Sequence, residues 1–382
     1  MTERSARRVS PHAAAAALAA AALLAPGAAR AVEGVIYSGS AFVDYWGIPD
    51  REAGKSSPQG VAPMASIRLG IDVNDDLAFT AKACISCHGV DFEHVALDYQ
   101  PKSWFNVQLG RISVPFGEFS NRVDPGSYKT ASQPLIYDMG RMAYGGRSAM
   151  NLGVLPLPYV DTGALVYGVR WLGEKIQVWY GVYGVAGLRG SNDLDWMAMR
   201  SIPYNDNNRV PAGGGRLALA YSANPGDFFG DANLGASYTA GRYDKDGTRR
   251  YEVWSVDATL RLAKLLVRGE YASRRTDLDP AARYPYQLVD TWFEKDGFYA
   301  EAEVPLGGYL SAVYRYEQLH RVGTPLPGAV EELSPDSTFV RHSGGVVITP
   351  AAALYLKLSW EMWQTTDFGD FQTYHAGIGG AF

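Results

Sequence analysis

The chain has 382 residues, a formal net charge of −5, 24 tyrosines, 9 tryptophans and 42 glycines. This mild negative charge, without any run of basic residues, argues against nucleic acid as a partner. Beyond the first 31 residues, no apolar run approaches the ~18 residues expected of a membrane-spanning helix, so a mature chain that enters a membrane must cross it with strands. The sequence also lacks a nucleophile elbow, a phosphate-binding glycine loop and a metalloprotease motif, and we predict that the protein is not an enzyme.

The N-terminus has the features of an export signal. Arg4, Arg7 and Arg8 precede the Ala/Leu-rich run 13–24, and Ala29-Arg30-Ala31 is a cleavage site of the A-x-A type. We therefore predict a signal peptide over residues 1–31 and one mature domain over residues 32–382. Export would place the cysteines in an oxidising compartment, where a disulfide or a haem thioether can persist.

Most of the mature chain alternates between apolar and polar residues with a period of two. Segment 254–262, WSVDATLRL, follows this alternation without exception. Recurring segments of about ten residues with outward Tyr and Trp are typical of a transmembrane β-barrel with an apolar lipid face and a polar lumen. We predict an all-β fold, a transmembrane antiparallel β-barrel of about 16 strands, wide enough to hold a water-filled lumen. The predicted strands are 36–46, 66–73, 78–88, 91–100, 104–112, 161–172, 175–187, 213–223, 228–242, 250–262, 264–275, 295–304, 308–319, 338–348, 352–364 and 371–382.

Short turns alternate with longer connections between these strands. Outer-membrane barrels have short periplasmic turns and long extracellular loops, so we expect both termini in the periplasm, the barrel in the outer membrane and lipid around it. The terminal segment 374–382 ends in Phe382 and resembles the C-terminal strand that the barrel-assembly machinery recognises. The longer connections are 47–65, 113–160, 188–212, 276–294 and 320–337.

The third long connection, 113–160, is the longest, and long loops in compact domains are usually functional. We expect this extracellular loop to fold into the lumen as a constriction, where its charged side chains would select the ions that pass. The alternative is an external loop whose charges face water. The candidate constriction residues are Arg122, Asp124, Lys129, Asp138, Arg141 and Arg147.

A mixed set of charges falls on the predicted lumen face of the later strands. We expect these side chains to solvate the channel and to pair across strands rather than to act in catalysis. They are Arg261, Arg268, Glu270, Arg274, Glu301, Glu303, Arg315, Glu317, Lys357 and Glu361.

Segment 105–119, FNVQLGRISVPFGEF, contains a strand that enters LGR-x-x-VPFGEF. Over about 30 residues this region resembles the phosphate-selective porin (O/P-type) superfamily of outer-membrane channels. The resemblance implies a porin barrel through which small solutes pass, and it allows a homotrimer. We do not extend it to phosphate selectivity, because no dense row of lumen-facing Lys and Arg is present and the net charge argues against a strong anion trap.

The only two cysteines lie in segment 83–89, ACISCHG. The motif C-x-x-C-H in an exported protein is the signature of covalent haem c, in which Cys84 and Cys87 would form the thioethers and His88 would bind the iron. Strand parity places Lys82, Cys84 and His88 on the lumen side and Ile85 on the lipid side. The candidate sixth ligands are His94, His375, Met139, Met142 and Met150.

With this motif the protein resembles the fused monohaem cytochrome–porins. The resemblance implies one haem c as cofactor and electron transfer at or across the outer membrane. A periplasmic or extracellular cytochrome would be the partner, since one haem cannot cover a hydrocarbon core of ~30 Å.

Two alternatives to haem stay open. One is a passive porin for small hydrophilic solutes with a structural or redox Cys84–Cys87 pair. The other is a zinc or copper site formed by Cys84, His88 and His94. Residues i and i+3 of a strand point to opposite faces. Attachment of haem to both cysteines, or a disulfide between them, therefore requires the segment to curl.

Overall fold

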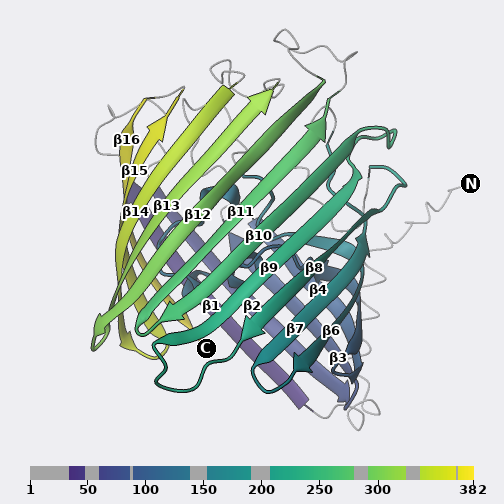
Figure 1. Ribbon diagram of the computed structural model, residues 1–382, viewed down its shortest axis with the longest axis horizontal. Helices are drawn as coiled ribbons and strands as arrows, with labels where there is room; N and C mark the ends of the chain where they lie inside the picture. The colour runs from purple at the N-terminus through teal and green to yellow at the C-terminus, as the bar shows by residue number, and fades with distance from the viewer. Residues whose placement is uncertain are drawn as a thin grey trace, which may run out of the picture.

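The protein, seen in a computed structural model, forms a closed antiparallel barrel in which each strand pairs with its sequence neighbours and β1 pairs with β16 (Figure 1). The structure describes residues 34–47, 60–86, 89–137, 153–190, 207–278, 291–323, 336–366 and 369–382. The described residues form sixteen strands, which confirms the predicted fold class: β1 (Gly34–Gly47), β2 (Gly60–Asn74), β3 (Leu77–Ser86), β4 (Gly89–Lys102), β5 (Phe105–Ser113), β6 (Val160–Leu172), β7 (Ile176–Val185), β8 (Ala212–Tyr221), β9 (Phe229–Arg242), β10 (Arg250–Leu262), β11 (Leu265–Asp277), β12 (Trp292–Gly307), β13 (Leu310–Gly323), β14 (Asp336–Ala351), β15 (Leu354–Thr365) and β16 (Phe371–Ala381).

Two strand boundaries differ from the sequence-based prediction in ways that affect function. Strand β2 begins at Gly60 rather than at residue 66, because its pairing with β1 continues as far as Trp46 opposite Gly60. Strand β3 ends at Ser86 rather than at residue 88, because Ser86 already pairs with Gly89 across the hairpin. The predicted signal peptide, residues 1–31, lies outside the described residues. Within the described ranges, no helix is both long enough and apolar enough to cross a membrane.

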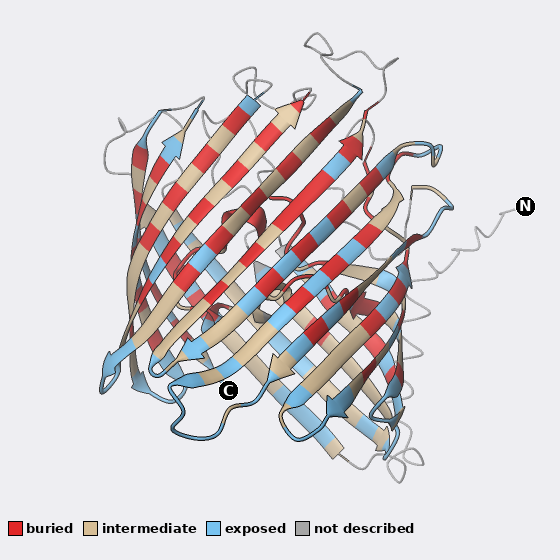
Figure 2. Cartoon of the chain, viewed as in Figure 1, coloured by how far each residue is buried: buried red, intermediate tan, exposed pale blue. Residues whose placement is uncertain are grey.

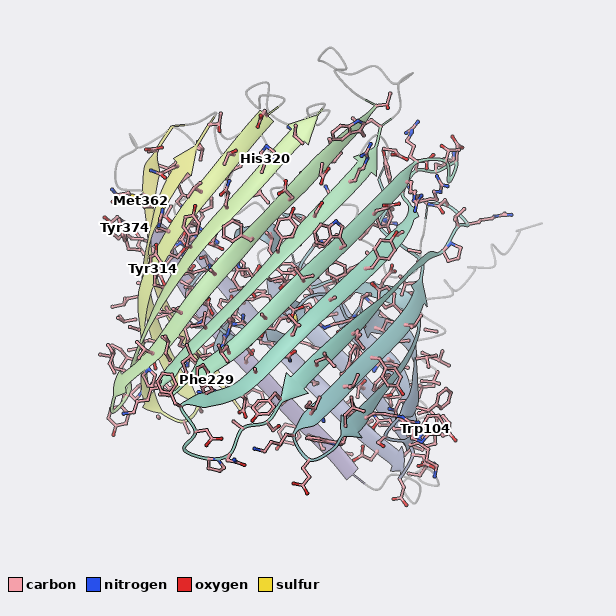
Figure 3. The ribbon with its side chains drawn as sticks, in the orientation of Figure 1. Trp104, Phe229, Tyr314, His320, Met362 and Tyr374 are labelled. Atoms are coloured by element: carbon pink, nitrogen blue, oxygen red, sulfur yellow. The ribbon has the colours of Figure 1, made fainter. Side chains whose placement is uncertain are left out.

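The alternation of residues gives the barrel two different faces. Outward residues such as Leu234, Trp254 and Val256 are exposed, and buried positions alternate with them along strands such as β10 (Figure 2). Aromatic side chains gather toward both ends of the strands, as Trp104 and Phe229 at one end and Tyr374 toward the other illustrate (Figure 3). An apolar band between aromatic girdles is the outer face of a barrel embedded in lipid.

The inside of the barrel contains a hydrophobic core, which the sequence did not predict. Phe116, Phe119 and Tyr137, from the long loop after β5, are at most 1% exposed. They belong to one cluster with wall residues such as Tyr299 and Phe339. This core fills the part of the lumen in which the described loop residues lie.

The seam between the first and last strands is closed by backbone and side-chain contacts. The N–H of Gly39 donates to the C-terminal carboxylate of Phe382 at 3.0 Å, and the N–H of Phe382 donates to the carbonyl of Gly39 at the same distance. Further along the seam, His375 Nδ1 lies 3.0 Å from Asp44 Oδ2. Closure pairs the two strands that would otherwise be open edges.

Candidate functional site

The long loop between β5 and β6 lies inside the barrel where it is described. We call residues 114–159 the inward loop, of which 114–137 and 153–159 are described. Its two limbs are joined by the N–H of Val114, which donates to the carbonyl of Tyr159 at 2.9 Å, and by the N–H of Val154, which donates to the carbonyl of Ile136 at 2.7 Å. The inward loop runs through the interior of the barrel (Figure 1).

Glu270 on β11 is the anchor for the first turn of the inward loop. Its carboxylate accepts hydrogen bonds from the N–H groups of Glu118 at 3.2 Å and Phe119 at 3.3 Å. The hydroxyl of Tyr137 donates to the same carboxylate at 2.5 Å. Burial, and then the proximity of Glu270, raise the pKa of Tyr137 well above its usual range, so the phenol keeps the proton that it donates.

Gly117 sits at the point where this turn approaches the wall most closely. Its φ is +66°, and a Cβ atom there would overlap the Glu270 carboxylate and the Tyr137 hydroxyl. Only glycine suits both the left-handed backbone and the close contact. The VPFGEF segment of the sequence is thus the entry of the loop into the lumen, with Phe116 and Phe119 in the core around Gly117.

A second set of anchors lies on β13 and β15. The Arg315 guanidinium is fully buried and lies 3.3 Å from Glu301 and 3.0 Å from Glu317. The same guanidinium donates to the Thr130 hydroxyl of the inward loop at 2.6 Å. Lys357 donates to the carbonyls of Pro125, Tyr128 and Thr130, the last two at 2.5 and 3.1 Å.

The expected pairing across strands is confirmed, as between Arg268 on β11 and Glu301 on β12 at 3.4 Å. The expectation that these charges solvate a channel is wrong for the residues under the inward loop. Glu317 binds the N–H of Leu135 at 2.9 Å, and Glu361 accepts a hydrogen bond from the Ser132 hydroxyl. Both carboxylates are at most 1% exposed. Unpaired buried charges are costly, so each is matched by backbone groups or by opposite charges. Of the predicted wall residues, Arg261 is an exposed exception near the periplasmic end of β10.

The described candidates for the constriction have different environments. Arg122 is paired with Glu118 at 2.8 Å and is largely covered. Asp124 reaches across to β3, where Lys82 Nζ lies 2.7 Å away. The Lys129 side chain is 32% exposed and its Nζ is 3.8 Å from Glu303. The remaining candidates lie outside the described residues: Asp138, Arg141 and Arg147.

The lumen wall of β2–β4 keeps several charged and polar groups within reach of solvent. Arg68 on β2 is exposed and has no ion pair or hydrogen bond with any described residue. Lys82 on β3 is paired with Glu93 at 2.9 Å as well as with Asp124. Predicted faces are confirmed here, since Lys82 is buried toward the lumen and Ile85 is exposed on the outside.

Glu93 is a residue that sequence reasoning missed. Strict alternation along β4 would direct it to lipid, because His94 faces the lumen. A register shift opposite Lys82 and Ala83 forms a β-bulge, in which Lys82 pairs with His94 and Ala83 pairs with Phe92. The bulge turns Glu93 inward to Lys82. The residues around Glu93 do not indicate that a β-bulge forms there.

The described part of the cysteine motif is extended strand. Cys84 is a half-buried free thiol, and residues 84–86 pair with residues 89–91 on β4. Of the proposed sixth ligands, His94 has partners on both ring nitrogens, Thr80 at 2.7 Å and the Ser113 N–H at 3.3 Å. His375 is likewise held between Asp44 and Glu361. Outside the described residues lie Cys87, His88, Met139, Met142 and Met150.

Among the residues that the structure describes, no group of three or more His, Cys, Asp and Glu side chains is arranged to hold a metal ion. The predicted site of Cys84, His88 and His94 includes one residue beyond the described ranges and stays a prediction.

A cavity of about 480 Å³ lies beneath the inward loop, toward the periplasmic ends of β1, β2, β14, β15 and β16. The loop residues Asp124 to Lys129 form part of its lining, and strand residues supply the rest. Its cationic side chains are Arg68, Lys82, Lys129 and Lys357, and its acidic groups are Asp124 and the C-terminal carboxylate of Phe382.

No family model and no curated protein matches this sequence, but solved structures share its fold. The anion-selective porin from Comamonas acidovorans is similar with a TM-score of 0.58 and 12% identity, covering 91% of this chain and 99% of that one. OmpF of Salmonella typhi, solved in complex with daunomycin, is similar with a TM-score of 0.57 and 13% identity, covering 91% and 97%. The outer membrane channel DcaP of Acinetobacter baumannii is similar with a TM-score of 0.54 and 12% identity, covering 91% and 97%.

At this level of identity the likeness establishes the fold alone. The protein is an outer-membrane β-barrel with the sixteen-strand architecture of porins.

Proposed function

We propose that the barrel lets small hydrophilic solutes diffuse across the outer membrane, along the side of the inward loop that faces β2 and β3. The observation that carries this proposal is the unequal cover of the lumen. The loop is bonded to Glu270, Arg315 and Lys357 on one side. On the other side it leaves Arg68 exposed and touches the wall through the Asp124–Lys82 bridge. Charged side chains beside a narrow passage would control which ions pass.

Planar-bilayer recording of the purified barrel tests this proposal. We expect stepwise ohmic conductance, and a change in ion selectivity when Lys82 is replaced by Met. Arg250→Gln is the matched control, because Arg250 lies at an exposed strand end beside Glu252. A barrel that keeps the heat-dependent gel mobility of a folded β-barrel and never conducts would contradict the proposal.

The O/P-type porin resemblance of segment 105–119 and the homotrimer that it allows are also part of this proposal. Segment 105–119 itself supports the resemblance, because its second half forms the entry of the inward loop. Sedimentation of the purified barrel in detergent tests the homotrimer, and we expect a mass of three protomers. We also keep the prediction that the barrel has no enzymatic activity.

The competing function is electron transfer through one haem c attached at Cys84 and Cys87, with His88 as an iron ligand and a periplasmic or extracellular cytochrome as partner. Its support is the C-x-x-C-H motif in an exported protein. Residues 84–86 are paired strand, and Cys87 and His88 lie outside the described residues. We rank solute passage first, because the solved structures that share this fold include porins and an outer membrane channel.

A haem-stained denaturing gel and a pyridine haemochrome spectrum separate the two functions. Covalent haem would give a coloured band at the mass of the barrel that disappears in Cys84→Ala. Expression with the haem-attachment machinery present is essential, and a known exported cytochrome c is the positive control. A colourless barrel that conducts would leave solute passage alone.

A further inference from the structure

We propose that the cavity beneath the inward loop is a binding site for a small organic carboxylate that enters or leaves the lumen. This inference rests on the proposed function, because it names the class of solute that the passage would take. A volume of about 480 Å³ is within the range of small-molecule sites, which are roughly 300–1,000 Å³. The cavity reaches the periplasmic ends of its strands, so a solute can approach it without moving the anchored loop.

Arg68 supplies the group that would bind the anion. It is exposed in the cavity lining and has no partner among the described residues. A guanidinium presents parallel N–H groups that match the two oxygens of a carboxylate. The hydroxyls of Ser40 and Ser66 lie 2.9 Å apart on the same wall, and the Ser66 hydroxyl donates to Asp124 at 3.4 Å, so Arg68 supplies the free donors.

The other charges of the cavity are already matched. Asp124 is bonded to Lys82 at 2.7 Å. Phe382 accepts the Gly39 N–H at 3.0 Å. Lys357 is bound to the loop carbonyls, so its N–H groups stay occupied. Lys129 Nζ lies 3.8 Å from Glu303. Among the described residues of the lining, the Arg68 guanidinium is thus the cation that remains available, which the net charge of the whole protein does not predict.

Tyr355 gives the cavity an aromatic face. The side chain is 9% exposed and lines the cavity. Its hydroxyl is covered and has no hydrogen-bond partner among the described residues, so the ring and not the hydroxyl would meet a ligand.

The remaining lining explains why the anion would be organic. Val347, Ala352 and Ala353 form an apolar wall, and the Tyr355 ring stacks on Phe42 at 5.9 Å between centroids. An aromatic or branched aliphatic body would contact this wall while its carboxylate meets Arg68. Inorganic phosphate would leave the apolar wall uncovered.

Calorimetry on the purified, folded barrel in detergent tests the site with potassium benzoate as the probe. Benzamide is the neutral control of the same shape, and inorganic phosphate tests a small anion. We expect benzoate to bind at least tenfold more tightly than either. Phosphate binding as tight as benzoate binding would overturn the organic class, and equal binding of benzamide would overturn the anion site.

Arg68→Gln and Arg261→Gln form a matched pair, since both arginines are exposed on barrel strands and only Arg68 lines this cavity. We expect about a tenfold loss of benzoate affinity in Arg68→Gln and none in Arg261→Gln. Tyr355→Phe keeps the ring and removes only a covered hydroxyl, so we expect it to leave the benzoate affinity unchanged. Equal affinities in all three variants and the wild type would overturn the site.

Conductance recordings keep this result separate from the proposed passage. A barrel that conducts, and in which benzoate binding does not depend on Arg68, loses the carboxylate site and keeps the passage. A barrel that binds benzoate through Arg68 and never conducts loses the passage and keeps the site.

Discussion

The two sides of the lumen carry similar residues and use them differently. On β11–β15 the charged side chains are buried under the inward loop and bind its backbone, as Arg315 and Glu317 do. On β2–β4 the charges meet the loop at the Asp124–Lys82 bridge, and Arg68 stays exposed. Both sides follow the same alternation of polar and apolar residues. A lumen-facing charge is therefore an anchor or a lining group according to what packs over it.

Arg315→Met should give the largest effect, because it removes the cation between two buried carboxylates, Glu301 and Glu317. Breaking a buried pair from one side costs about 3–5 kcal/mol. We expect that loss in the free energy of unfolding, measured in urea with the barrel in detergent, together with new protease cleavage in the inward loop. Arg250→Met removes an exposed charge and should change neither measurement. Equal behaviour of the two variants would show that the buried wall does not anchor the loop.

Gly117→Ala should cause the next largest loss in the free energy of unfolding. The left-handed backbone costs alanine about 1–2 kcal/mol, and crowding against Glu270 adds about 1–3 kcal/mol. Gly226 also has a positive φ, +93°, but open space where a Cβ would be. Gly226→Ala should therefore show the backbone cost alone, in the same unfolding experiment. If the two variants lose the same stability, the close contact at Gly117 is not what positions the turn.

Asp124→Asn addresses the exposed side of the comparison. Its carboxylate is partly exposed, and the buried Lys82 keeps Glu93 at 2.9 Å as a second partner, so the free energy of unfolding should change little. The reversal potential in a salt gradient should move toward the equilibrium potential of the anion, because one negative charge beside the proposed passage is lost. Glu252→Gln, at an exposed strand end, is the control. An unchanged reversal potential in Asp124→Asn would remove this carboxylate from the passage.

Asp244 should give the smallest effect, since it organises a local turn between β9 and β10. Burial raises its pKa, but the N–H groups of Arg249 and Thr248 and the Thr248 hydroxyl donate to the carboxylate and hold the pKa below its ordinary value. A lowered pKa means that this stabilisation is present at neutral pH and is lost as the pH falls below about 4.

We expect Asp244→Asn to speed amide hydrogen exchange at Thr248 and Arg249 at pH 7, with the inward loop unaffected. In the wild type, the same two amides should lose protection, relative to the intrinsic exchange rate, in acid. Protection that persists in the variant would show that the carboxylate does not hold the turn.

The barrel could be predicted from the sequence, and the packing of its interior could not. Alternation in segments such as 254–262 predicts strands and their faces, because lipid on one side and polar groups on the other leave one workable arrangement. The candidate constriction was found by loop length, yet Arg122 proved paired and covered while Asp124 crosses to Lys82. Glu93 escaped prediction because a β-bulge changes the side to which it points.

Local pattern determined what each strand residue prefers, outward to lipid or inward, and hence the closed ring of strands. Contacts between residues more than 100 positions apart decided the rest, as in Gly117 with Ser237 and Lys357 with Thr130. Such contacts depend on how one loop packs in the interior, and a period of two contains no information on which polar face will be covered. The chemistry of the proposed passage therefore depends on the tertiary structure.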